Sequence, residues 1–323
     1  MEYNDLGRTG MKVSQLCFGT MSFGGDADEA TSAAMFKQCR DAGINFFDCA
    51  NVYAEGRSEE ILGKLIADCR DDLVITSKVF GQMGDHANAG GLSRRHVVQA
   101  VEDSLRRLNT DRLDIYFVHQ YDAATPIEEV VDVMDELVRQ GKILYPAVSN
   151  WSAWQTTKAL GIAERKNNVR FACMQPMYNL TKRQAEVELL PLAESEQLGV
   201  IPYSPVGGGL LAGKYSTGAK PESGRLVENA MYTKRYYEDI YFEVAEKFVA
   251  HANERGVHPV SLAVAWVGAH PAVTAPIIGA RNPEQLQASL AAVEVNMTSE
   301  WRAEIDDLSP TPALATDRSD ERR

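Results

Sequence analysis

The sequence predicts an α/β fold in which eight parallel β-strands, each followed by a helix, close into a barrel. Eight short apolar runs recur along the chain, and segments with the helical spacing of apolar residues lie between them. Strands that alternate with helices form a parallel sheet, and eight is the number that closes into a (β/α)8 (TIM) barrel. In order, the runs are LCFG, INFF, LVITS, LDIYFV, ILYPAV, FACM, VIPY and VTAPII.

A doubly wound parallel sheet is the alternative fold for such an alternation. Sheets of that kind that bind dinucleotides carry G-x-G-x-x-G after the first strand. The corresponding stretch here, CFGTMSFGG, has the wrong glycine spacing. The barrel is therefore the favoured prediction.

The segments outside the strands fit a single barrel domain over residues 1–323. The residues before Leu16 predict a β-hairpin with GRTG as its turn, which would plug the bottom of the barrel. Two long segments, 80–92 and 204–235, follow the third and seventh strands and are expected to be functional loops at the opposite face. The polar tail, 309–323, is expected to be flexible.

Apolar stripes at helical spacing predict helices between the strands. One stripe runs from Val97 to Leu108 and another from Ile127 to Val138. For the second helix, Thr125 is predicted to be the N-cap, with Pro126 at the first helical position and Glu128 completing a capping box.

The composition excludes several function classes. Of the 323 residues, 45% are hydrophobic and 24% are charged, and the formal net charge is −12, which disfavours nucleic acid and anionic membranes as partners. The N-terminus lacks the apolar core of a signal peptide, and no apolar run is long enough to span a bilayer. Five cysteines without a CxxC pair predict a reduced, cytoplasmic protein, in which Cys49 is a bystander thiol. The sequence does not indicate an oligomeric state.

Four polar residues at strand ends form the strongest functional signal. Asp48, Lys78 and His119 end the second, third and fourth strands, and Tyr53 follows the second. Side chains at the carboxyl ends of barrel strands converge on one face. Lys78 is then the natural partner of Asp48, and its charge is expected to lower the pKa of Tyr53 from its ordinary value of about 10. The group would protonate a carbonyl oxygen held by His119, and the lysine would compete with any metal ion.

The remaining strand ends suggest what attacks the carbonyl carbon. Ser149, Asn150 and Gln175 carry groups that grip a carboxamide, and the ring of Tyr203 is suited to lie against a planar heterocycle. Directly afterwards, SPVGGGLLAGKY exposes backbone amides of the kind that bind phosphate.

A second anion site is predicted where the eighth strand runs into IIGARNPEQL. Asn282 is the expected N-cap, Pro283 the first helical residue and Gln285 its capping-box partner, and Arg281 adjoins them. Together with the preceding groups, this set describes a nicotinamide dinucleotide. No acidic residue lies between Gly279 and Pro283, so Arg281 is predicted to favour NADPH over NADH.

At this point the sequence resembles the aldo-keto reductase family over nearly its whole length. The resemblance rests on LGRTGMKVSQLCFGTM, INFFDCANVYAEGRSEEILG, SLRRLNTDRLDIYFVHQYD, AVSNW, YSPVGGGLLAGKY and IIGARNPEQL. It implies a (β/α)8 barrel, the catalytic tetrad Asp48, Tyr53, Lys78 and His119, and a small-molecule carbonyl substrate reduced with NADPH. The cofactor-binding residues expected from the residues and the resemblance are Gly19, Thr20, Met21, Ser149, Asn150, Gln175, Tyr203, Ser204, Pro205, Gly207, Gly208, Leu210, Lys214, Gly279, Arg281, Gln285 and Ser289.

The sequence departs from the family at three positions. Ser289 stands where many relatives carry an adenine-contacting asparagine, and Pro146 and Ala147 replace the usual isoleucine and glycine. The first departure concerns adenine contacts and leaves the chemistry intact, and the other two are expected to act only on the local backbone.

The substrate pocket and an alternative role complete the expectations. Phe23, Phe80 and Trp151 are predicted to line the substrate pocket, together with Met21 and the segment YTKRYY (232–237), which suggests a carbonyl on an apolar or aryl group. Some members of the superfamily are channel-associated regulatory subunits that bind cofactor and act through a partner. The short N-terminus offers no inhibitory or docking extension, so the enzyme is the favoured reading.

Overall fold

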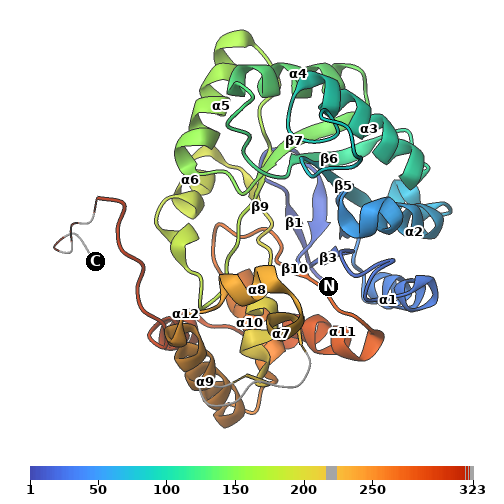
Figure 1. Ribbon diagram of the computed structural model, residues 1–323. Helices are drawn as coiled ribbons and strands as arrows, with labels where there is room; N and C mark the ends of the chain where they lie inside the picture. Colours follow the sequence, from blue (N-terminus) through green and yellow to red (C-terminus); the bar gives the residue numbers. More distant parts are fainter. Residues whose placement is uncertain (216–223, 317, 319, 321–323) are drawn as a thin grey trace.

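A parallel eight-stranded sheet forms the centre of the computed structural model, which describes residues 1–215, 224–316, 318 and 320 (Figure 1). The sheet order is β10-β3-β4-β5-β6-β7-β8-β9, and all neighbours are parallel. The strands are β3 (Cys17–Gly19), β4 (Phe46–Asp48), β5 (Val74–Val79), β6 (Leu113–Val118), β7 (Ile143–Ser149), β8 (Cys173–Gln175), β9 (Gly199–Val200) and β10 (Ile277–Ile278). Each lies in one of the eight predicted runs or adjoins it.

Hydrogen bonds between the two ends of the sheet close the barrel. The amide of Thr274 donates to the carbonyl of Val200 at 2.8 Å, and the amide of Ile277 donates to that of Pro202 at 2.9 Å. The stretch before β10 therefore lies along the stretch that contains β9. The fold is the (β/α)8 barrel predicted from the alternation of strands and helices.

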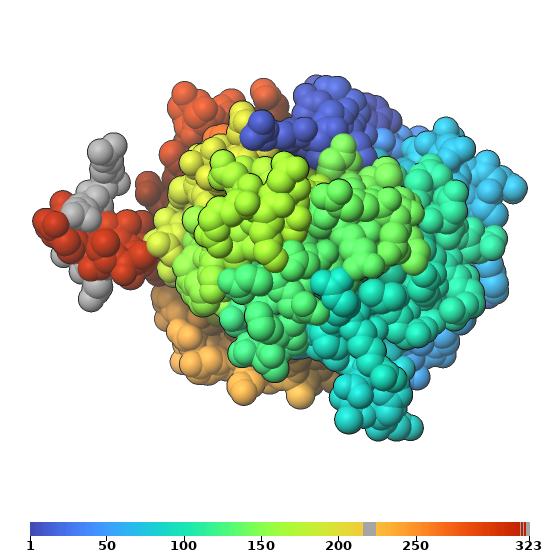
Figure 2. Space-filling model, turned by 90° about the horizontal axis from the view of Figure 1, so that it is seen from above, coloured from blue at the N-terminus to red at the C-terminus, as the bar shows by residue number. Residues whose placement is uncertain are grey.

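The N-terminal hairpin covers the bottom of the barrel, as predicted. Its strands β1 (Tyr3–Asp5) and β2 (Lys12–Ser14) pair antiparallel. Leu6 and Val13 are fully buried in the cluster of apolar side chains that fills the barrel interior. In Figure 2 the dark blue hairpin lies at the top, whereas the teal segment after β5 and the orange segment with α7 and α8 lie at the bottom. The hairpin and the long loops thus occupy opposite faces.

Helices surround the strands and bury their apolar stripes against them (Figure 1). In the helix at 94–108, Val97, Val101 and Leu108 are fully buried, as the spacing predicts. The helices are α1 (Glu29–Asp41), α2 (Arg57–Ile66), α3 (Arg94–Leu108), α4 (Ile127–Arg139), α5 (Ala153–Lys166), α6 (Leu189–Glu196), α7 (Arg225–Glu228), α8 (Ala230–Arg235), α9 (Asp239–Glu254), α10 (Pro259–Gly268), α11 (Pro283–Leu290) and α12 (Ser299–Asp306). None of the described helices is long and apolar enough to cross a membrane.

The predicted capping of α4 is wrong. Pro126 itself is the N-cap residue and no side chain caps the helix. The hydroxyl of Thr125 donates instead to Asp122 Oδ2 at 2.8 Å, and the same oxygen accepts the amide of Leu92. The Asp122 carboxylate holds the threonine hydroxyl, and it ties the end of the 80–92 loop to the entry of α4.

The long segment after β9 is partly helical rather than an open loop. It contains the 3-10 turn η4 (Gly207–Ala212), α7 and α8, and residues 216–223 lie outside the described residues. Of the tail, residues 317, 319 and 321–323 also lie outside the described residues, and Ser309 is held by a hydrogen bond to the carbonyl of Leu180.

Candidate active site

A buried ion pair lies at the carboxyl ends of β4 and β5. Lys78 Nζ is 2.6 Å from Asp48 Oδ2, and the two side chains are 0% and 2% exposed. The other carboxylate oxygen, Oδ1, accepts from Thr76 Oγ1 at 2.8 Å and from Gln175 Nε2 at 2.9 Å. Burying a charged pair costs free energy unless its remaining hydrogen-bonding capacity is also used. The Asp48 carboxylate meets this condition, because Thr76 of β5 and Gln175 of β8 both donate to its second oxygen.

The Lys78 ammonium donates hydrogen bonds to three acceptors at the mouth of the barrel. Besides Asp48, it contacts the carbonyl of Cys49 at 2.7 Å and the hydroxyl of Tyr53 at 3.3 Å. Burial disfavours the charged ammonium, but the charge of Asp48 and its hydrogen bond outweigh this, so the pKa of Lys78 is raised. Lys78 is therefore a fixed positive charge directed at the phenol.

The backbone after β4 turns sharply to present Tyr53. Ala54 and Glu55 follow it with φ of 47° and 58°, which non-glycine residues adopt uncommonly. Two such residues in succession concentrate local strain beside the phenol, which is typical of functional sites.

The predicted direction of the Tyr53 pKa is wrong. Burial raises the pKa of Tyr53 to about 12, and the charge of Lys78 opposes this only in part. The reason is that Asp48 neutralises much of the lysine field and itself disfavours a phenolate. The phenol is thus fully protonated at neutral pH, which is the form that a proton donor requires.

His119 follows β6 and faces the phenol. The two rings lie edge to face with centroids 6.0 Å apart. Burial, assisted by the charge of Lys78, lowers the pKa of His119 to about 3. The imidazole is neutral at physiological pH and can donate one hydrogen bond without adding charge.

A cavity of about 700 Å³ opens over these groups. Three of the four tetrad residues line it, whereas Lys78 lies behind them, buried. Of the residues predicted for cofactor or substrate, the cavity is lined by Gly19, Met21, Phe80, Ser149, Asn150, Gln175, Tyr203, Ser204, Pro205, Gly208, Gly279 and Ser289.

The β7, β8 and β9 ends place amide and phenol groups along one wall of this cavity. Tyr203 Oη donates to Asn150 Oδ1 at 2.8 Å, and Asn150 Nδ2 donates to the carbonyl of His119 at 2.9 Å. Ser149 Oγ donates to the carbonyl of Gln175 at 3.0 Å. The wall is therefore linked to the catalytic side by direct hydrogen bonds.

The glycine-rich turn after β9 allows a close approach of the backbone. Gly207, Gly208 and Gly209 all have positive φ, at 61°, 67° and 97°. A Cβ on Gly208 would lie 2.7 Å from the Tyr232 ring, so a side chain is excluded there. The donor set and the open turn fit a nicotinamide carboxamide and a diphosphate.

The N-terminus of α11 is capped as predicted, with one difference. Asn282 Oδ1 accepts the amide of Gln285 at 2.9 Å, but Gln285 Oε1 accepts the amide of Arg281 rather than that of the cap residue. Arg281 is not free either, because it pairs with Asp26 at 3.1 Å and with Glu228 at 3.4 Å. The local stretch lacks acids, but other elements bring two of them to this arginine.

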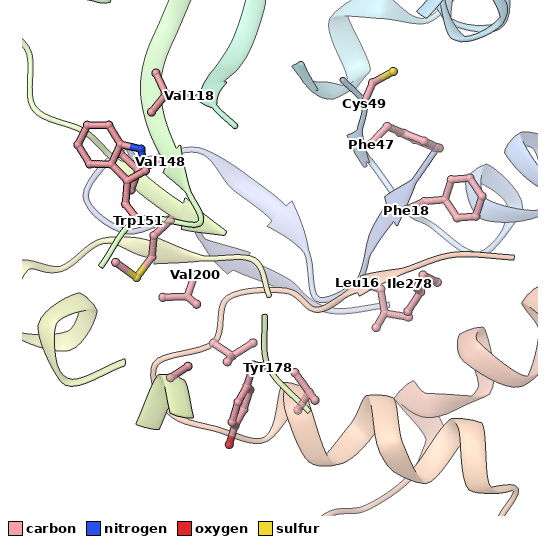
Figure 3. Close-up of a cluster of buried hydrophobic side chains, with 14 of the residues drawn as sticks. Leu16, Phe18, Phe47, Cys49, Val118, Val148, Trp151, Tyr178, Val200 and Ile278 are labelled. Carbon is pink, nitrogen blue, oxygen red and sulfur yellow. The ribbon is translucent and has the colours of Figure 1, made fainter. Parts of the chain in front are cut away.

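Phe23 and Trp151, which were predicted to line the substrate pocket, belong to the core instead. Phe23 is 0% exposed and packs against Phe18, and Trp151 is 4% exposed. Figure 3 shows Trp151 among buried side chains that include Val118 and Val148. Both predictions are wrong because an aromatic residue after a strand is as well suited to packing as to lining a pocket.

Several predicted cofactor residues do not line the cavity. Thr20 and Leu210 are fully buried, and Thr20 Oγ1 donates to the carbonyl of Asp48. The others that lie outside the lining are Gly207, Lys214, Arg281 and Gln285.

The segment that carries α7 and α8 lines the cavity with two residues of the predicted wall YTKRYY and with two that the sequence did not indicate. Arg225, Met231, Tyr232 and Arg235 line it from the segment GRLVENAMYTKRYY. Tyr232 and Arg235 belong to YTKRYY, whereas Arg225 and Met231 were missed, because only the unusual length of the segment pointed to them. Val52, Gly81 and Ile277 were also missed, and their apolar character carries no signal of a site.

Comparisons with known proteins agree with this geometry. Residues 15–310 match the Aldo/keto reductase family. A probable voltage-gated potassium channel subunit beta of Arabidopsis thaliana is 40% identical over 303 positions, which cover 91% of this chain and 92% of the relative. An uncharacterized oxidoreductase YrpG of Bacillus subtilis (strain 168) is 38% identical over 329 aligned positions, which cover 98% of each chain. A putative voltage-gated potassium channel subunit beta of Schizosaccharomyces pombe is 35% identical, with 94% of this chain and 92% of the relative covered.

Proposed function

The chain belongs to the aldo/keto reductase family and is an oxidoreductase of that family, and from this premise we propose that it reduces aldehyde or ketone carbonyls to alcohols with NADPH, with Tyr53 as general acid. The observation that carries the proposal is the Tyr53 hydroxyl in the cavity, 3.3 Å from a buried ammonium. The cytoplasmic location expected from the sequence belongs to the same proposal.

The residues of the chain divide the work at the carbonyl oxygen. Tyr53 gives its proton to the oxygen as negative charge develops there, and the neutral His119 holds the oxygen by a hydrogen bond. Lys78 then stabilises the phenolate that is left, since its Nζ is already within reach of the hydroxyl. Asp48 keeps the ammonium in place.

The cavity wall that carries the cofactor would be that of Ser149, Asn150, Gln175 and Tyr203, with the diphosphate at the glycine-rich turn. A bound reduced nicotinamide supplies the hydride that the carbonyl carbon receives. The products are then the alcohol and the oxidised nicotinamide, with Tyr53 reprotonated from solvent.

The decisive experiment is Tyr53→Phe, which removes only the hydroxyl. General acid catalysis contributes about 100- to 10,000-fold, so aldehyde reduction should fall by that factor while NADPH binding is retained. Steady-state turnover and fluorescence titration of NADPH measure the two effects. Near-normal turnover in the variant would show that Tyr53 is not the acid.

A second candidate function is favoured by the names of two similar proteins. The relatives from Arabidopsis thaliana and Schizosaccharomyces pombe are named as channel subunits. A cofactor-binding regulatory subunit would bind NADPH but turn over carbonyl substrates weakly. Turnover of an aldehyde by the purified chain alone distinguishes the two, because an enzyme needs no partner for it.

A further inference from the structure

Two arginines give the cavity a charge that the catalytic residues do not need. Among the described lining residues, Asp48 is the one acid, and Lys78 neutralises it. Arg225 and Arg235 also line the cavity, and neither forms an ion pair with a described carboxylate. In a chain of net charge −12, two guanidinium groups in one cavity that no described carboxylate neutralises mark a site for anions.

The two arginines are held by stacking rather than by acids. Both guanidinium groups lie against the Tyr232 ring, with the Arg225 and Arg235 guanidinium carbons 5.2 and 5.1 Å from its centroid. The guanidinium of Arg235 is also 5.9 Å from the centroid of the Tyr203 ring. Contacts of this kind fix the direction of a guanidinium and leave its N–H donors free.

Arg225 lies toward the cofactor diphosphate and adenosine. It belongs to α7, whose Glu228 contacts Arg281 at the start of α11. In the same helix, Leu226 Cδ1 lies 3.2 Å from the position of a Cβ on Gly208 of the glycine-rich turn. This arginine therefore has an anion to bind in the proposed function itself.

Arg235 lies toward the wall that carries Tyr203 and Asn150. Its neighbour Tyr203 is connected to Asn150 by a hydrogen bond of 2.8 Å, and Asn150 to the backbone of His119 by one of 2.9 Å. The proposed function places the diphosphate at the glycine-rich turn and the nicotinamide at the wall with Tyr203, so Arg235 is the arginine nearer to the nicotinamide and to the carbonyl that it reduces.

We propose that Arg235 binds an anionic group of the substrate, and that the preferred substrates are apolar or aryl carbonyl compounds that carry a carboxylate. Val52, Phe80 and Met231 supply apolar walls around the same cavity, which suits an aryl body. The planar fork of a guanidinium matches the two oxygens of a carboxylate. The inference rests on the proposed reduction and adds the substrate class to it.

The test compares 4-carboxybenzaldehyde with its neutral analogue, methyl 4-formylbenzoate. The wild type should favour the carboxylate by about tenfold or more in kcat/KM, which is the size of one charge-assisted contact. Arg235→Gln should remove most of that preference, mainly through KM. Arg225→Gln is the matched control, because it should weaken NADPH binding and leave the ratio between the two substrates unchanged.

A binding measurement without turnover completes the test. Calorimetric titration of 4-(hydroxymethyl)benzoate into the NADPH-loaded protein should show binding that Arg235→Gln weakens about tenfold or more. If neither aldehyde is reduced but this binding holds, the anion site stands and the proposed reduction fails. If both aldehydes are reduced equally well, or Arg235→Gln weakens NADPH binding and leaves the substrate ratio intact, the inference about Arg235 is overturned.

Discussion

At the scale of single residues, the site combines a neutral acid, a neutral histidine and one compensated ion pair. The pKa values of Tyr53 and His119 are displaced in opposite directions, to about 12 and about 3, and burial is the leading cause of both. Neither group changes its charge in the physiological range. The site can therefore donate a proton and a hydrogen bond over a wide span of pH.

The displaced pKa of His119 predicts the pH dependence of both activity and stability. The imidazole is neutral above pH ~4, so kcat/KM for an aldehyde should show no inflection near the ordinary histidine pKa of about 6.5. Between about pH 6.5 and 3 the unfolded chain binds a proton that the folded chain does not, so stability falls as pH falls through that window. Denaturant unfolding from pH 7 to 4.5 should show a shallower decline in His119→Asn than in the wild type.

An inflection of kcat/KM between pH 6 and 7 that disappears in His119→Asn would contradict this prediction. A buffer series at constant ionic strength is the necessary control.

A second prediction concerns the ion pair. Lys78→Met leaves Asp48 buried with only the hydrogen bonds from Thr76 and Gln175, and loss of one partner of a buried pair costs about 3–5 kcal/mol. Denaturant unfolding should show a loss of this size. The double variant Asp48→Asn/Lys78→Met should regain part of it, because the buried charge is then gone. An unchanged stability of Lys78→Met would mean that the carboxylate is better solvated than its 2% exposure implies.

At the scale of elements, α7 lies between the glycine-rich turn and α11. A carboxylate of α7 and one of the loop before α1 both pair with Arg281. Glu228 and Asp26 both pair with Arg281, so a ribose phosphate would have to share this guanidinium with two carboxylates. The preference for NADPH is then a balance between the arginine and its acids.

We expect Arg281→Ala to weaken NADPH binding by about tenfold or more, the size of one lost charge-assisted contact, and to leave NADH nearly unchanged. Glu228→Gln should act in the opposite direction and strengthen NADPH relative to NADH, since one repelling charge is removed. Fluorescence titration of both cofactors against both variants measures this. An equal loss for NADPH and NADH in Arg281→Ala, or a wild type that prefers NADH, would contradict the role of Arg281.

Sequence reasoning succeeded where an element's position depends on periodicity and chain order. The eight strands, the hairpin and the meeting of Asp48, Lys78, Tyr53 and His119 follow from alternation and from the convergence of strand ends. It failed where the outcome depends on tertiary competition. The pKa of Tyr53 depends on whether burial, which raises it, outweighs the charge of Lys78, which lowers it. No local sequence pattern shows which of the two effects is larger.

The same limit applies to the loops and the cavity walls. Trp151 is an aromatic residue that packs inward, and Arg225 lines the cavity from α7. The spacing of apolar and polar residues around these two positions predicts neither placement. The acids that meet Arg281 come from elements more than 50 residues away, which a local reading of IIGARNPEQL does not reach.

At the scale of the whole molecule, the packed hairpin and the catalytic tetrad lie at opposite faces of the barrel. Leu6 is fully buried where the hairpin meets the barrel interior, and Gly199 faces it so closely that a Cβ would lie 2.5 Å from Leu6 Cδ1. The fit at the bottom is tight, and no tetrad residue takes part in it.

Leu6→Ala should therefore lower the free energy of unfolding by about 2–5 kcal/mol, the usual range for such a truncation in a packed core. Because the cavity is at the other face, KM and kcat of the folded variant should stay unchanged. Lys12→Ala, at an exposed position of the same hairpin, is the matched control and should stay within about 0.5 kcal/mol of the wild type. A loss of activity parallel to the loss of stability would show that the two faces are coupled.

The strands of the barrel differ in length, and the shortest ones lie where the sheet closes, so we expect the barrel to open there first. β5, β6 and β7 have six, six and seven residues, whereas β9 and β10, which meet where the sheet closes, have two each. Amide protons of Thr274 and Ile277 should therefore exchange with solvent sooner than those of β6, by sub-global opening along this line. The glycine-rich turn follows β9, and Arg281 and α11 follow β10. A dinucleotide bound to both would therefore connect the two strands between which the barrel opens. Binding of the dinucleotide should therefore slow amide exchange most at Thr274 and Ile277. The ligand would hold the two ends of the sheet together where the strands are shortest.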